Sequence, residues 1–190
     1  MLSPENLRQM EKLASSQNPD QNVKCFLAGK NSTPFESSAS ENTKKPESTL
    51  SQEEKDQIKA ETGWSDEIVD AISSMEEYEI YKNAGLIEAE INGKKCLIKA
   101  DLDMDQVDDA GRTNKERMEM GLASIDKSGE TIELHHIGQK SDGPLAELTT
   151  SEHRGKGNDT VLHDKSKESE IDRVAFTKER SSHWEERATA

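Results

Sequence analysis

Apolar and aromatic residues are scarce in this sequence. Of its 190 residues, 31% are apolar and 4% are aromatic. With its 11 glycines included, the apolar share is about 37%, against roughly 45–50% for a typical soluble domain. Because 34% of the residues are charged, we expect part of the chain to form no buried core.

Long hydrophobic runs, a secretion signal and paired cysteines are also missing. No apolar run approaches the roughly 20 residues that a membrane-spanning helix needs. The opening MLSPENLRQM lacks a basic stretch followed by an apolar one, so no signal peptide is expected. Two isolated cysteines, Cys25 and Cys96, exclude a disulfide-stapled secreted mini-protein and a cysteine-type zinc ribbon.

The negative charge is concentrated in the middle of the chain and divides it into three parts. The net charge of −14 splits into 0 for residues 1–50, −11 for residues 51–110 and −3 for residues 111–190. Residues 1–50 hold four of the five prolines in a low-complexity sequence, which predicts a disordered leader. Residues 51–110 are predicted to form an acidic helical and hairpin region that packs on a core built by residues 111–190.

Local signals predict two helices and a hairpin in the acidic region. Ser51-Gln-Glu-Glu54 fits a capping box, and the helix that it begins should end at Gly63. A second helix should run from Ser65 to Gly85, because its apolar residues recur at helical spacing. Asn92-Gly93 lies between two short apolar runs, which is the strongest short-range signal for a β-hairpin.

The distribution of histidine along the chain indicates a functional site. All five histidines lie in the last 56 residues, and four of them fall between positions 135 and 163. Residues 131–134 are predicted to form a strand that leads into His135-His136. Since neighbouring residues of a strand point to opposite faces, these two histidines should do different work. Pro144 should then open a short helix or turn, and Gly155 should end the helix that carries His153.

A cluster of imidazoles in this pattern is typical of a catalytic metal site. Neutral imidazoles bind Zn, Ni and related ions, and three of them leave coordination positions open. A fourth imidazole that does not bind the ion has a pKa near 6.5 and suits a general base. The combination favours a single-metal phosphodiesterase. The alternative is a structural metal-binding interaction domain in which four imidazoles close the ion, and the adjacency of His135 and His136 argues against it.

The histidines belong to a longer pattern. Its strings are IELHHIGQ (132–139), which contains Leu134-His135-His136, then PLAELT (144–149), EHRGKGN (152–158) and LH (162–163). They are preceded by GRTNKERMEMGLASID (111–126) and followed by DRVAFTKERSSHWEERA (172–188). Together these strings resemble the LHH family, a toxin-nuclease branch of the HNH/endonuclease VII superfamily. The resemblance spans roughly residues 51–188 and is strongest over 111–163.

The resemblance implies an α+β fold with a small ββα-metal (treble-clef-like) HNH core, preceded by helices and a β-hairpin. Residues 111–190 would be the nuclease domain. Its activity would be metal-dependent endonucleolytic hydrolysis of nucleic acid, with DNA as the favoured substrate and one divalent ion (Zn, Ni, Mg or Mn) as cofactor. An RNase with the same site is the alternative, because a site centred on phosphate reads the backbone more than the bases.

The resemblance also implies roles for the clustered histidines. His135 resembles the metal ligand of the first strand, and His136 resembles the general base that activates water. His153 and His163 resemble ligands supplied by the helix and by the segment after it. Ten residues separate His153 from His163, against four in colicin DNases, so a phosphate contact is the alternative role for His163.

Four further residues are candidates for supporting roles. The middle Asn of the HNH motif has no evident counterpart, and Gln139 or Asn158 is the candidate for orienting the base. Arg154, next to a proposed ligand, and Arg180, between two aromatic residues at helical spacing, are candidates for phosphate contacts. The fifth histidine, His183, is expected at the surface.

The same resemblance suggests a biological setting. Modules of this family occur in bacterial polymorphic toxins, which implies a cognate immunity protein as a second partner besides nucleic acid. It also implies synthesis in the bacterial cytoplasm, export by a specialised secretion system and action in the cytoplasm of a target cell.

Removal of the predicted leader should leave the rest of the protein intact. Residues 1–50 have no periodic apolar face, so they cannot offset an ordering cost of about 1–2 kcal/mol per residue. A chain that begins near Thr49 should remain folded and keep full nuclease activity, as measured by thermal unfolding and plasmid nicking. Loss of soluble, metal-binding protein on truncation would show instead that the leader is part of the core.

Overall fold

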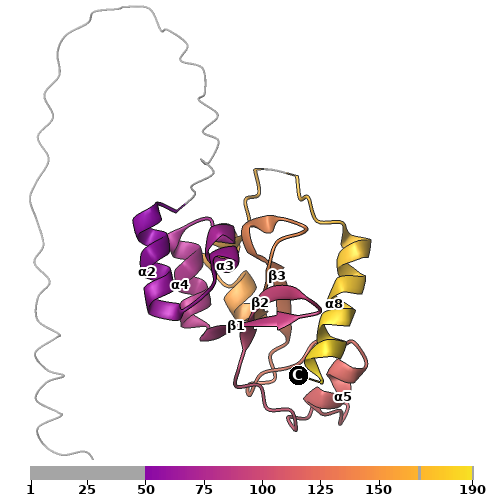
Figure 1. The fold of residues 1–190 in the computed structure, drawn as a ribbon. Coiled ribbons are helices and arrows are strands. Elements are labelled where there is room, and N and C mark those ends of the chain that lie inside the picture. The colour runs from indigo at the N-terminus through magenta and orange to yellow at the C-terminus, as the bar shows by residue number, and fades with distance from the viewer. Residues whose placement is uncertain (1–49, 167, 190) are drawn as a thin grey trace, which may run out of the picture. The chain divides into compact units, whose positions relative to one another are not determined.

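The structure is a computed structural model in which residues 50–166 and 168–189 are described (Figure 1). The predicted leader, Leu50 excepted, lies outside the described residues. The elements are, in chain order, α2 (Gln52–Thr62), α3 (Asp66–Ala71), α4 (Met75–Asn83), β1 (Leu86–Ile91), β2 (Lys94–Lys99), α5 (Asn114–Glu119), β3 (Ile132–His136), the 3-10 turn η2 (Ile137–Gln139), β4 (Leu145–Thr149), α6 (Thr150–Arg154), α7 (Asn158–Leu162) and α8 (Arg173–Arg187).

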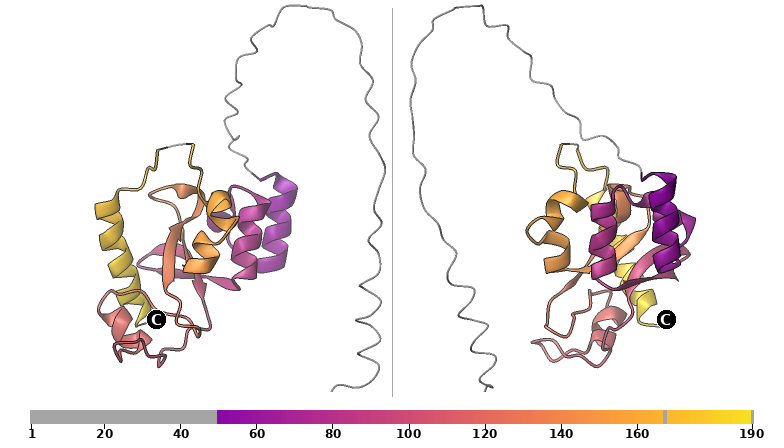
Figure 2. Two further views of the ribbon diagram at one scale, coloured as in Figure 1. Left: turned by 180° about the vertical axis from the view of Figure 1, so that it is seen from behind. Right: turned by 90° about the vertical axis from the view of Figure 1, so that its left-hand side faces the viewer.

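A four-stranded sheet with the order β1-β2-β4-β3 forms the centre of the described residues. The pairs β1/β2 and β3/β4 are antiparallel, whereas β2 and β4 are parallel. Helices α2, α3 and α4 lie on one side of the sheet and α8 lies on the other (Figure 1 and Figure 2). This arrangement confirms the predicted α+β class. Strands β3 and β4 and helix α6 follow one another in the chain as a ββα unit, with β3 at the edge of the sheet.

Alternation of side chains along the strands produces an apolar core on each face of the sheet. One core joins α2, α3 and α4 to the sheet, and Tyr78 and Tyr81 are fully buried in it. The other joins the sheet to α5 and α8 and contains the fully buried Trp184. Ile132 and Leu134 of β3 belong to the second core. The odd-numbered residues of β3 therefore face the side of α4, and the even-numbered residues face α8.

The first predicted helix is confirmed, whereas the second is wrong in its length. Ser51 caps α2 through a capping box, and Gly63 with a φ of 73° ends it. The continuous helix predicted over residues 65–85 is instead the pair α3 and α4, because Ile72 is extended with a ψ of 128°. The Ser74 hydroxyl caps α4 anew. Serine competes with a continuing helix because its hydroxyl can accept a backbone N–H at a cap.

The predicted hairpin is confirmed, and the prediction for the segment after Pro144 is wrong. Asn92 and Gly93 have φ values of 54° and 71°, as a type I′ turn requires. Residues 145–149 form strand β4, where we expected a short helix or turn. All five side chains of β4 are buried, because β2 and β3 flank it and helices cover both faces. A short apolar run of this kind has no period that separates a buried strand from a helix.

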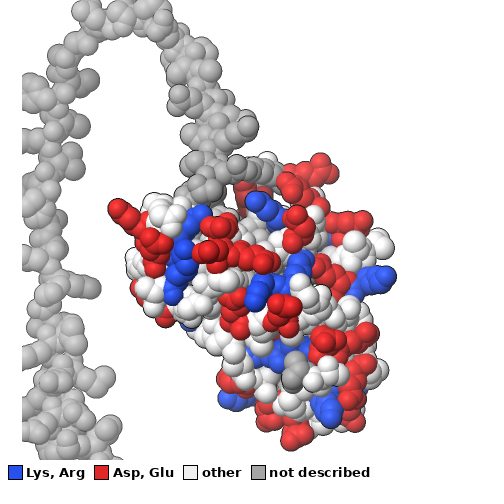
Figure 3. Space-filling view, viewed as in Figure 1, with Lys and Arg blue, Asp and Glu red and all other residues white. Residues whose placement is uncertain are grey.

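The surface of the described residues is densely charged. Acidic side chains are spread over the face seen in Figure 3, with Lys and Arg scattered among them. Several charged side chains form exposed ion pairs, such as Lys127–Asp101 at 3.3 Å. Exposed pairs contribute little to stability, so the two apolar cores must supply most of it. The described residues contain no helix that is both long enough and apolar enough to cross a membrane.

Gly138 lies where the end of β3 passes close to α3, and substitution there should destabilise the fold. Its φ is 67°, and a Cβ atom would lie 2.5 Å from the Ala71 carbonyl oxygen. Gly129 is a matched control, since its φ is 84° but a Cβ there would meet nothing within 4 Å. Gly129→Ala should cost only the backbone strain of about 1–2 kcal/mol. Gly138→Ala should lower the free energy of unfolding by clearly more in urea titrations, and equal losses would contradict the close approach.

Candidate active site

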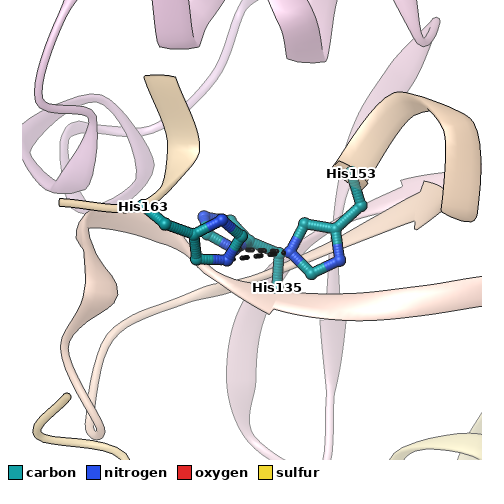
Figure 4. A group of neighbouring side chains, drawn as sticks. All are labelled: His135, His153 and His163. Carbon is teal, nitrogen blue, oxygen red and sulfur yellow. Dashed lines mark hydrogen bonds between the residues drawn. The ribbon is translucent and has the colours of Figure 1, made fainter. Parts of the chain in front are cut away.

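Three imidazoles converge on the face of β3 that looks toward α4 (Figure 4). His135 comes from β3, His153 from the last turn of α6, and His163 from the residue that ends α7. Nε2 of His153 lies 3.1 Å from Nδ1 of His135 and 3.2 Å from Nε2 of His163. One ligand atom of each residue lies within 4.8 Å of the others. Sequence positions up to 28 residues apart are thus brought to one point.

The hydrogen bonds of two of these rings leave lone pairs that face each other. Nδ1 of His153 donates to a carboxylate oxygen of Glu133 at 2.7 Å. Nδ1 of His163 donates to the backbone carbonyl of Asp159 at 3.1 Å. In the neutral rings both Nε2 atoms are then acceptors, and two acceptors at 3.2 Å repel unless a proton or cation lies between them. The buried Nε2 atom of His135 has no hydrogen-bond partner among the described residues.

The residues present fit a divalent ion. Imidazole nitrogens bind zinc at about 2.0–2.1 Å in tetrahedral sites, which places ligand atoms about 3.3–3.4 Å apart. The observed separations of 3.1 and 3.2 Å are close to that value. Burial lowers the pKa of His135 well below its usual value, and its neighbouring imidazoles act in the same direction. Burial also lowers the pKa of His153. Both rings are therefore neutral at pH 7, which is the form that coordinates metals.

Glu133 supports the cluster from the same face of β3. One oxygen of its carboxylate accepts hydrogen bonds from Nδ1 of His153 and from Nε of Arg154, both at 2.7 Å. Burial alone would raise the pKa of Glu133, but the hydrogen bonds from Arg154 and His153 outweigh it and hold the pKa below its usual value. A carboxylate that fixes the tautomer and orientation of a histidine is the usual partner of a metal-binding imidazole.

His136 lies on the opposite face of β3, against α8. Its Nε2 is 3.1 Å from a carboxylate oxygen of Glu179, and the Phe176 ring lies 4.6 Å from its own ring, centre to centre. Only 5% of His136 is exposed. Burial lowers the pKa of His136, and the Glu179 carboxylate partly opposes the shift. The two adjacent histidines have different partners and different surroundings, as the alternation of a strand requires.

The candidates for orienting the base bind elsewhere. The Gln139 side-chain oxygen accepts the backbone N–H of Asp164 at 2.7 Å. The Asn158 amide donates to the backbone carbonyl of Glu152 at 2.9 Å. Each hydrogen bond holds a segment next to one of the three converging histidines. His136 is hydrogen-bonded to Glu179, a residue that the sequence did not single out.

The two candidate arginines lie on either side of the site. Arg154 stands beside the three-histidine cluster, with Nε on Glu133 and a side chain that is 64% exposed. The Arg180 guanidinium lies 5.9 Å from the centre of the Phe176 ring, which also contacts His136. Arg154 thus shares the Glu133 carboxylate with His153, whereas Arg180 is connected to His136 only through Phe176.

The expectation that His183 lies at the surface is wrong. Only 3% of it is exposed, and its Nε2 lies 2.9 Å from a carboxylate oxygen of Glu147. Glu147 is fully buried on β4 and also accepts hydrogen bonds from Arg187 and from the backbone N–H of Lys99. A buried carboxylate needs such partners. The contacts of Glu147 with His183 and Arg187 hold α8 against the sheet, so the role of His183 is structural.

Sequence reasoning missed the three glutamates of this region. Glu133 could have been found, because it precedes His135 by two positions on a strand and must share its face. Glu147 lies in the segment that we did not recognise as a strand. Glu179 is 43 residues away from His136 along the chain, and no local pattern connects them.

Comparison with protein families agrees with this geometry. The model of the LHH family, described as a nuclease of the HNH/ENDO VII superfamily with conserved LHH, matches residues 113–190. The ββα unit and the histidine cluster both lie inside that segment. No solved structure matches the chain.

The match identifies residues 113–190 as a nuclease segment of the HNH/ENDO VII superfamily, a hydrolase whose substrate is nucleic acid. Within that superfamily, residues 113–190 belong to the LHH family, and Leu134-His135-His136 is its LHH motif. The resemblance to the LHH family noted from the sequence is thereby confirmed over residues 113–190.

Substitution of Glu133 should weaken metal binding without unfolding the protein. Glu133→Gln removes the charge that holds His153, so we expect a loss of about 10- to 100-fold in zinc affinity, measured by competition with a chromophoric chelator. Glu119→Gln, at an exposed position of α5, removes the same charge far from the cluster and should leave the affinity unchanged. An undiminished affinity in Glu133→Gln would rule out its supporting role.

Proposed function

We propose that this chain is a metal-dependent endonuclease that hydrolyses phosphodiester bonds of DNA. In this proposal His135, His153 and His163 hold one divalent ion, and His136 is the general base. The observation that carries the proposal is the convergence of three imidazoles, two of them with Nε2 atoms 3.2 Å apart, beside a fourth imidazole on the other face of the same strand.

The position of His136 favours catalysis over a closed structural site. A structural zinc site uses four protein ligands, whereas a catalytic site has three and keeps one position open. Here His136 binds Glu179 across the strand from the other three histidines, so three imidazoles remain for the ion. Because β3 is an edge strand, no further strand of the described sheet lies between this edge and an approaching phosphate.

The residues then have separate tasks. When bound, the ion would supply electrostatic stabilisation of the charge that develops on the phosphate and on the leaving oxygen. His136 takes a proton from the attacking water. Arg154 and Arg180 bind phosphate oxygens of the substrate backbone.

We infer the wider setting from the resemblance to polymorphic toxins. The chain would act as the toxic module of a bacterial secretion or contact system, with residues 1–50 as a leader, residues 51–110 as a region that packs on the core, and residues 111–190 as the nuclease domain. A cognate immunity protein would be its second partner. Co-expression with a neighbouring open reading frame that relieves toxicity in a bacterial host would test this setting.

A digestion assay tests the activity directly. Purified protein is stripped with EDTA, reloaded in turn with Mg, Mn, Zn or Ni, and incubated with supercoiled plasmid and, in parallel, with total RNA. Nicked and linear plasmid that appears only with added metal supports the proposal. Degradation of RNA alone would favour the RNase alternative, and cleavage that persists in EDTA would exclude the metal.

Two substitutions should separate metal ligand from base. His153→Ala should lose both bound metal and cleavage, because it removes the central nitrogen of the cluster. His136→Ala should keep the metal and fold normally, yet cleave about 10²–10⁴-fold more slowly, the usual contribution of a general base. Metal content is measured by atomic emission and rates by plasmid nicking.

The opposite pattern would reassign the roles. If His136→Ala loses stoichiometric metal while His135→Ala retains it, the ligand and the base are exchanged. Full activity in both variants would refute the nuclease mechanism proposed for this site.

A further inference from the structure

His136 is held on its α8 side by a chain of three side chains. Nε2 of His136 is 3.1 Å from Oε2 of Glu179, and Oε1 of the same carboxylate is 2.5 Å from Nζ of Lys94. Phe176, one helical turn before Glu179, covers the His136 ring at 4.6 Å. The histidine lies on β3, the glutamate on α8, and the lysine at the start of β2.

We propose that Glu179 is the positioning residue of His136, and that Lys94 holds Glu179 in place for that task. The proposal rests on the role of His136 as general base given above. It adds that a residue of the hairpin, outside the segment that matches the nuclease family, completes the catalytic arrangement.

The hydrogen bond to Glu179 selects one tautomer of His136. An ionised carboxylate can only accept a hydrogen bond, so the neutral imidazole must carry its proton on Nε2. The lone pair is then on Nδ1, the nitrogen that faces away from Glu179. A base that takes a proton from water needs this free lone pair, and a carboxylate that fixes the tautomer of a catalytic imidazole is a recurrent arrangement.

Lys94 restricts the rotation of the Glu179 carboxylate. The side chains of Lys94 and Glu179 are 25% and 30% exposed, so the pair is partly shielded from water. With one oxygen on Lys94 and the other on His136, the carboxylate cannot rotate away without losing both contacts. Asn92, in the turn before Lys94, donates from its amide to the Ser182 carbonyl of α8 at 2.9 Å and thus holds hairpin and helix together.

A purely structural role for Glu179 makes a different prediction. An ion pair between two partly exposed side chains contributes little to stability, and its loss would change cleavage only through unfolding. A positioning role requires that the effect of Glu179 pass through His136. The two readings are separated by measuring the tautomer and by combining the substitutions.

The tautomer can be read without any activity. Long-range ¹H–¹⁵N spectra of the full-length, metal-free protein at about pH 8, where imidazoles are neutral, should show His136 as the Nε2–H form. Glu179→Ala should give a mixture of both tautomers, and Lys94→Met a smaller shift in the same direction. Glu186→Ala, at an exposed position of the same helix, should leave the spectrum unchanged. An Nδ1–H form in the wild type, or no change in Glu179→Ala, would overturn the proposal.

A double-substitution cycle tests the catalytic consequence. Glu179→Ala should lower kcat about 10- to 100-fold with little change in KM or metal content, as expected for loss of an orienting partner. In a His136→Ala background the same change should cost nothing further, because the group it orients is gone. Equal losses in both backgrounds would show that Glu179 acts through the fold alone. Glu179→Gln preserves the shape of the side chain and one acceptor oxygen, so it controls for a folding defect. Its kcat should lie between those of the wild type and of Glu179→Ala.

The outcomes distinguish this inference from the proposed function. A wild-type protein that cleaves no nucleic acid with any metal would refute the proposed activity, while the tautomer spectra would still decide whether Glu179 positions His136. A cleaving wild type with an unaffected Glu179→Ala variant would refute only the positioning role.

Discussion

The alternation of side chains along the edge strand β3 is the constraint on which the site depends. Successive residues must point to opposite faces, so His135 joins the cluster beside α4 while His136 turns toward α8. The two apolar cores use the same alternation, with Ile132 and Leu134 on the α8 side. One short strand therefore belongs to both layers of the fold and carries a different chemical group on each.

Two carboxylates, the partly buried Glu133 and the fully buried Glu147, organise the two faces around that strand. Glu133 aligns His153 on one side, and Glu147 fixes α8 on the other through His183 and Arg187. Replacing a partner of a buried charge by an apolar group usually costs several kcal/mol, because the remaining charge is left unpaired. Glu147 therefore fixes the position of α8 along the sheet. That position brings Glu179 of α8 opposite His136.

Local signals predicted those parts of the fold whose cause is local. The capping box at Ser51 and the Asn92-Gly93 turn depend on neighbouring residues alone, and both are present. The break between α3 and α4 and the strand β4 depend on burial against distant elements. The segment 145–149 becomes a strand because β2 and β3 flank it. The sequence of these five residues contains no signal for that pairing.

The same distinction separates the parts of the site. The strand pattern and the family resemblance pointed to the histidines, and the i, i+2 spacing could have pointed to Glu133. Glu179 and Lys94 are 85 residues apart in the chain, and only the packing of α8 against the hairpin makes them neighbours. His183 was misjudged for the same reason, since its partner Glu147 lies on a strand that the sequence did not reveal.

The parallel pairing of β2 with β4 has a consequence for the boundaries of this module. The family match begins at residue 113, yet β4 lies between β3 and the β2 strand of the preceding hairpin. A fragment cut at that boundary would leave the backbone of β4 unpaired along one side, an exposed edge open to pairing with other chains. It would also remove Ile91, Cys96 and Ile98 of the hairpin from the apolar core that they share with Trp184. The unit that folds, and the unit that recombination could transfer intact between proteins, therefore has to include the hairpin as well as the recognisable nuclease segment.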